Sequence, residues 1–103
     1  MKDIKIATAQ FENKSGDKAY NLGVIDKLTK IAAEEEAQVV AFHECSITGY
    51  SFARHLSKEQ MLDLAELIPG GPSIKKLAEI SAKNDIVILA GLFIELPRRV
   101  AKP

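Results

Sequence analysis

Three side chains capable of acid–base or nucleophilic chemistry follow one another as His43, Glu44 and Cys45. They come directly after the apolar run Val39–Phe42, which is typical of a strand buried on both faces in a parallel sheet. Ligands of open α/β sheets bind beyond the carboxyl ends of the strands. Among apolar residues a carboxyl group acquires a raised pKa, which suits a general base. The pattern therefore indicates Glu44 as a candidate general base, with a capping or solvated loop carboxylate as the alternative.

The neighbours of Glu44 are expected to have less active roles. If the extended backbone continues past the strand, neighbouring side chains point to opposite faces, and Cys45 and Glu44 would then not share a site. We expect Cys45 to be a small buried residue, and His43 to be satisfied or partly buried, with proton transfer as its alternative. We expect His55 to lie at the surface, together with three lysines on predicted helices: Lys58, Lys75 and Lys76.

The sequence predicts no metal site and no disulfide. Its single cysteine cannot form an internal disulfide, and cysteine and histidine do not cluster with the spacing of a zinc site. A flavodoxin-like binding domain would need a phosphate loop after its first strand. Residues 11–18 contain one glycine, Gly16, so this reading is kept as a further alternative without a motif to support it.

The elements that position these residues alternate between strand and helix. Apolar and β-branched runs predict strands over residues 4–11, 39–42 and 86–94. Capping residues and apolar periodicity predict helices over residues 17–36, from 57 to about 68, and over 72–84. The order strand, helix, strand, helix, helix, strand predicts an α/β fold with a parallel sheet and right-handed crossovers.

Local signals set the helix starts. Asp17 can cap the first helix, Ser57 and Gln60 match a capping box, and Pro72 fits the first turn of the third helix. The spacing of apolar residues predicts the face that each helix buries. These faces are Val24, Ile25, Leu28, Ile31 and Ala32 in the first helix, Met61, Leu62, Leu64, Ala65 and Ile68 in the second, and Ile74, Leu77, Ala78 and Ser81 in the third.

The composition is that of one ordinary globular domain. The chain has 103 residues, of which 47% are hydrophobic and 27% charged, and its net charge is zero. The zero balance gives no reason to expect a nucleic-acid partner or an anionic membrane surface. There is no leader-like apolar segment at the start and no run long enough to span a membrane. We therefore expect a cytoplasmic protein.

Three segments, taken in order, resemble the start of the carbon–nitrogen hydrolase, or nitrilase-type, superfamily. The first ends in Ala-x-x-Gln, and the second carries Glu44 ahead of Gly49-Tyr50. The segments are residues 5–11, residues 39–50, and a third set made of Gly71-Pro72, Leu77-Ala78 and residues 86–93. Together they cover residues 4 to 95, nearly the whole chain.

The resemblance implies a fold, a reaction and a role for Glu44. The family has an α-β-β-α sandwich and acts on non-peptide amides, nitriles and carbamoyl compounds without a cofactor. Its site joins a nucleophilic cysteine, a lysine that stabilises charge and a glutamate that moves protons. Glu44 matches that glutamate. By resemblance Tyr50 helps to form the pocket wall, with a core aromatic as the alternative, and His43 stands beside Glu44 where the family usually has proline.

The other two members of that site have no counterpart here, because in the family they lie well downstream. The resemblance therefore implies the N-terminal portion of such a domain over residues 1–95 and a divergent basic tail over 96–103. It implies a truncated hydrolase that is inactive by itself. The competing interpretation is a non-catalytic interaction or oligomerisation module. Half a sandwich leaves a sheet face or edge uncovered, which favours self-association.

Overall fold

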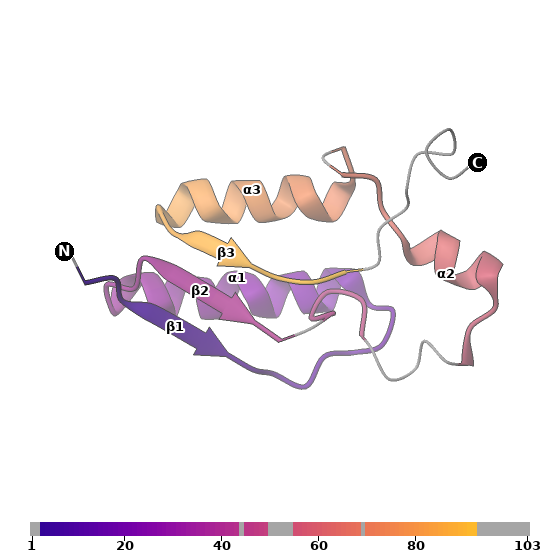
Figure 1. The fold of residues 1–103 in the computed structure, drawn as a ribbon, viewed down its shortest axis with the longest axis horizontal. Coiled ribbons are helices and arrows are strands. Elements are labelled where there is room, and N and C mark those ends of the chain that lie inside the picture. Colours follow the sequence, from indigo (N-terminus) through magenta and orange to yellow (C-terminus); the bar gives the residue numbers. More distant parts are fainter. Residues whose placement is uncertain (1–2, 44, 50–54, 69, 93–103) are drawn as a thin grey trace.

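The computed structural model describes residues 3–43, 45–49, 55–68 and 70–92, with strands and helices in the predicted order (Figure 1). The strands are β1 (Ile6–Ala9), β2 (Val39–Phe42) and β3 (Val87–Leu89). The helices are α1 (Lys18–Glu34), α2 (Lys58–Leu64) and α3 (Pro72–Asn84). β2 and α3 have the predicted bounds, whereas the other elements are shorter than predicted.

The three strands form one parallel sheet in the order β1-β2-β3. Ile6 pairs with Val39, which pairs in turn with Val87. Both crossovers run in the same direction across the sheet, and right-handed crossovers then place α1 and α3 on the same face. The two helices also pack against each other, so they form one layer over that face (Figure 1).

The core lies between the sheet and this helix layer. Its buried apolar residues are Ala32, Ala37, Val40 and Ile86, against which Phe42 and Ile88 also pack. The opposite face of the sheet remains open within the described residues: the side chains of Ile6, Val87 and Leu89 are 59%, 55% and 55% exposed. The prediction that residues 39–42 are buried on both faces is wrong for the part of the chain that the structure describes: Val40 is fully buried, but Val39, Ala41 and Phe42 are half-buried, because the described helices cover a single face.

The stripe that the first helix buries overlaps the predicted one: Ile25 and Ala32 are buried as predicted, and Val24 and Leu28 are half-buried. Asp17 caps it as predicted, and its carboxylate accepts a hydrogen bond from the backbone N–H of Tyr20. Ile31 of the predicted face is 50% exposed. The stripe turned toward the sheet and α3 includes two polar residues, and its buried members are Asn21, Ile25, Thr29 and Ala32.

The predicted faces of the other helices also need correction. The capping box of Ser57 and Gln60 is present, but no residue of α2 is buried, because this helix lies in the connection away from the sheet (Figure 1). Met61, Leu62 and Ile68 are exposed, and Leu64 and Ala65 are half-buried. In α3 the buried residues are Ser73 and Ile80, Ala78 is exposed, and Ile74, Leu77 and Ser81 are half-buried.

Candidate functional site

The carboxyl ends of the three strands meet at one edge of the sheet, because the strands are parallel. The segments that follow them carry the residues that the sequence singles out. Two of those residues, Glu44 and Tyr50, lie outside the described residues. The site is therefore described by the backbone on both sides of position 44 and by the side chains that bind this backbone.

The backbone after position 44 forms a closed turn over residues 45–49, hereafter the 45–49 turn. Cys45 has a left-handed backbone with φ 52°, Gly49 has φ 91°, and the Gly49 N–H donates to the Cys45 carbonyl at 2.8 Å. The backbone is not extended at Cys45, so the condition under which Cys45 and Glu44 point to opposite faces is not met. Cys45 is half-buried instead of fully buried, so its thiol is not a core residue.

The loops after the other two strands hold the 45–49 turn through backbone groups. The Ile47 N–H donates to the Gly91 carbonyl after β3 at 3.0 Å, and the Gly16 N–H donates to the Thr48 carbonyl at 2.8 Å. The Gly91 N–H also donates to Ser46 Oγ at 3.4 Å. Ser46, Ile47 and Thr48 are fully buried, so the turn is packed into the structure.

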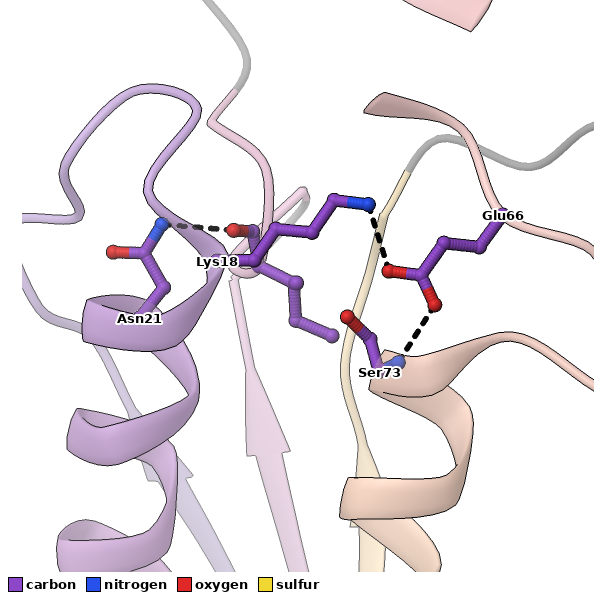
Figure 2. A network of polar contacts seen from close by, with 5 residues as sticks. Lys18, Asn21, Glu66 and Ser73 are labelled. Atoms are coloured by element: carbon purple, nitrogen blue, oxygen red, sulfur yellow. Dashed lines mark hydrogen bonds and ion pairs between the residues drawn. The ribbon is translucent and has the colours of Figure 1, made fainter. Parts of the chain in front are cut away.

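Asn21, in the first full turn of α1, adds a side-chain anchor. Its Nδ2 donates to the Lys14 carbonyl and to the Ile47 carbonyl, both at 2.8 Å, and its Oδ1 accepts from the Lys14 N–H at 2.8 Å. The residue is fully buried. Figure 2 shows its amide pointing away from the helix toward the carbonyl oxygen of the turn.

His43, directly after β2, is half-buried as predicted. Its ring meets the Phe11 ring edge to face, with 5.0 Å between ring centroids. Asn13 Nδ2 lies 3.4 Å from His43 Nε2 and 3.3 Å from the Cys45 carbonyl oxygen. An amide nitrogen donates, so this contact requires the tautomer with the proton on Nδ1, and the buried Nδ1 has no hydrogen-bond partner among the described residues. Asn13 thus contacts the chain on both sides of position 44.

A buried ion pair lies next to this edge, between the start of α1 and the start of α3. Lys18 Nζ donates to Glu66 Oε2 at 2.8 Å, and the Ser73 N–H donates to Glu66 Oε1 at 2.7 Å (Figure 2). The Glu66 side chain is 3% exposed and that of Lys18 23%. Burial by itself would raise the pKa of the Glu66 carboxyl, but the hydrogen bonds from Lys18 and Ser73 outweigh burial and hold its pKa below the usual value.

This carboxylate occupies the place where α3 would otherwise present free backbone N–H groups. Gly71, the residue before α3, has no side-chain cap of its own, and Glu66, in the connection that leads into α3, supplies the acceptor. The two meet so closely that a Cβ on Gly71 would lie 2.5 Å from Glu66 Oε1 and 2.8 Å from the Leu67 carbonyl oxygen. Both carboxylate oxygens of Glu66 thus bind protein groups, so Glu66 has a structural role in this arrangement.

The predicted surface residues lie as expected: His55, Lys58, Lys75 and Lys76 are exposed. Over the described ranges, no three histidine, cysteine, aspartate or glutamate side chains gather where they could hold a metal ion. None of the helices seen in that part of the chain is long and apolar enough to cross a membrane.

The groups that tie the edge together were not found from the sequence. Asn21 and Thr29 lie at the same helical spacing as Ile25 and Ala32. A polar residue at a position of the buried stripe is the sequence feature that could have indicated Asn21. Glu66 stands shortly before the Pro69–Pro72 break, and no local pattern links it to Lys18, which is 48 residues away.

Comparison with known proteins identifies the family. A family model described as carbon–nitrogen hydrolase matches residues 5–99, and the chain therefore belongs to the carbon–nitrogen hydrolase family. A protein of Pyrococcus abyssi (strain GE5 / Orsay) named Nitrilase is 28% identical over 88 residues, which is 85% of this chain and 32% of that relative. The chain thus spans about a third of the length of this relative.

Proposed function

We propose that this chain supplies Glu44 as the general base of a carbon–nitrogen hydrolase site. The observation that carries the proposal is the position of the 45–49 turn, which is anchored at the carboxyl end of the central strand and directly follows residue 44. Ligands of parallel α/β sheets bind at this edge. Family membership supplies the reaction class, and the matching motif supplies the role of Glu44.

The proposed reaction is hydrolysis of a non-peptide amide, nitrile or carbamoyl compound. Glu44 accepts the proton of a cysteine thiol, the sulfur attacks the carbonyl or nitrile carbon, and a lysine stabilises the negative charge that develops. The nitrogen takes up protons returned by Glu44 and leaves as its bond to carbon breaks, and water then cleaves the bond between carbon and sulfur. No residue of this chain is assigned to the cysteine or lysine role, since Cys45 lies in the turn next to Glu44 and Lys58, Lys75 and Lys76 lie on exposed helix surfaces. We propose that a further polypeptide segment supplies both groups.

Tyr50 and His43 are proposed to line the substrate pocket. The role of His43 is supported by its place after β2 and by its buried Nδ1, which has no hydrogen-bond partner among the described residues. The role of Tyr50 is supported by the family motif. The open face of the sheet supports a second sheet packing there, which would complete the α-β-β-α sandwich.

The balanced charge and single cysteine support a cytoplasmic protein without a nucleic-acid or membrane partner.

A hybrid enzyme tests the role of Glu44. The 88 matching residues of the Pyrococcus relative are replaced by this chain, and ammonia release from simple amides and nitriles is measured. We expect an active hybrid, at least about 100-fold lower kcat after Glu44→Gln, and unchanged circular dichroism. A folded hybrid whose Glu44→Gln variant keeps full kcat would refute the role. Glu44-dependent hydrolysis by the 103-residue chain alone would refute the need for a further segment.

The open sheet face favours a second candidate function, self-association as a non-catalytic module. The exposed side chains of Ile4, Ile6, Val87 and Leu89 lie on or beside this face. Apolar surface of this kind favours pairing with another polypeptide. Light scattering distinguishes this candidate, because an assembly held by this face forms without substrate and without Glu44.

A further inference from the structure

Asn21 uses its whole amide group inside the protein. Both Nδ2 protons are donated, one to the Lys14 carbonyl and one to the Ile47 carbonyl, and Oδ1 accepts from the Lys14 N–H, each at 2.8 Å. The side chain is fully buried. Removing a buried partner leaves the opposite groups unsatisfied, which costs more than the net value of the bonds. The carbonyl of Ile47 therefore depends on Asn21.

These bonds join Ile47 in the 45–49 turn to residues at least 26 positions before it in two neighbouring segments, the loop after β1 and α1. Lys14 lies in the loop after β1, Ile47 lies in the 45–49 turn after β2, and Asn21 lies on a helix packed over the sheet. The other anchors of the turn come from the loops after β1 and β3: backbone groups of Gly16 and Gly91, and the side chain of Asn13, which donates to the Cys45 carbonyl. Among the described residues, Asn21 is the side chain that links the turn to the helix layer.

We propose that Asn21 is a positioning residue for Glu44. By holding the Ile47 carbonyl, it fixes the 45–49 turn, which directly follows residue 44. The inference rests on the proposed function of Glu44, and it assigns to Asn21 a task beyond stabilising the fold. Small displacements of a reacting group cost large factors in rate, so a missing anchor is expected to lower kcat.

The first test uses hydrogen exchange in the 103-residue chain. In Asn21→Ala we expect the Ile47 and Gly49 amides, which donate within and beside the turn, to exchange at least about 10-fold faster than in the wild type. The matched control is Asn84→Ala, which removes a donor to the Ile80 carbonyl at the far end of α3. If Asn21→Ala does not fold, Asn21→Ser, which keeps one donor, replaces it. Unchanged exchange in a folded variant overturns the anchor.

The second test uses the hybrid enzyme. We expect Asn21→Ala to lower kcat at least about 10-fold with KM unchanged, whereas Asn84→Ala leaves both unchanged. Equal kcat for Asn21→Ala and Asn84→Ala would overturn the positioning role even if exchange in the turn is faster. Full activity of Glu44→Gln would instead refute the proposed function, and the exchange result for the anchor would stand.

Discussion

At the scale of single residues, Glu66 is the charged residue that is buried among those that the structure describes. Its carboxylate meets Lys18 and the Ser73 N–H, so charge and hydrogen bonding compensate for burial. The contact joins α1 to the connection that leads into α3, two segments that are distant in sequence. The ionised form of Glu66 therefore stabilises the folded state.

Replacing Glu66 by glutamine is expected to lower the free energy of unfolding by about 1–3 kcal/mol at about pH 7, because the ion pair is lost. The pKa of Glu66 is lower in the folded protein than its ordinary value of 4.5, so its contribution is present above that pH and is lost as the pH falls through the folded pKa. Urea unfolding at several pH values measures this.

The control for Glu66 is Glu79→Gln, which removes an exposed pair with Lys76 at 3.8 Å. Exposed pairs of this kind contribute little, so we expect a loss below about 0.5 kcal/mol. A Glu66→Gln variant no less stable than Glu79→Gln, or a stability difference from the wild type that does not shrink in acid, would contradict the prediction.

Gly71 carries a steric constraint at the same place. Its φ of −66° is open to any residue, but a Cβ would lie 2.5 Å from Glu66 Oε1 and 2.7 Å from Glu66 Cβ. We expect Gly71→Ala to destabilise the protein by about 1–3 kcal/mol through this clash. The matched control is Gly70→Ala, since a Cβ there meets nothing within 4 Å. Equal urea midpoints for the two variants would show that the close approach is not a constraint.

At the scale of elements, two helices with similar N-terminal caps have different connections to the core. Asp17 caps α1, which buries four residues against the sheet and α3, whereas Ser57 caps α2, which buries none. Losing either cap costs about 1 kcal/mol locally. The effect on the whole molecule depends on whether the helix packs on the core.

We therefore expect Asp17→Ala to lower the free energy of unfolding by about 1 kcal/mol, while Ser57→Ala leaves the urea midpoint nearly unchanged and speeds amide exchange within α2. Urea unfolding and hydrogen exchange measured on both variants check this. An equal loss of global stability in the two variants would mean that α2 unfolds together with the core.

At the scale of the whole molecule, the helices and the sheet form two layers, with one sheet face open within the described residues. The row of Ile6, Val39 and Val87 and the neighbouring Leu89 present apolar side chains there. Packed sheets and helices usually bury such a face. In a solution of the purified chain, a second copy of the chain can pack against this open face.

We expect the 103-residue chain to self-associate at high concentration, as measured by size-exclusion chromatography with light scattering. Leu89→Lys should weaken this association, because it puts a charge into the apolar face. The matched control is Leu67→Lys: Leu67 is 51% exposed and lies outside the strands, so this variant should associate like the wild type. A wild-type chain that stays monomeric at high concentration would contradict the prediction.

The sequence alone predicted the order of the elements, the caps at Asp17 and Ser57, and the bounds of β2 and α3, because these depend on local propensity and spacing. The family resemblance, which the family model supports over residues 5–99, depends on motifs that are also local. Glu44 was singled out on the same grounds, and its role stays a prediction.

Only the tertiary structure decided which faces are buried and which side chains hold the strand ends. The helix faces depend on how α1 and α3 pack together on one side of the sheet, so periodicity misplaced Ile31 and all of α2. Asn21 reaches Ile47 across 26 residues, and Lys18 reaches Glu66 across 48. Contacts of such long separation exist only once the sheet is assembled, because no local preference of the chain determines them.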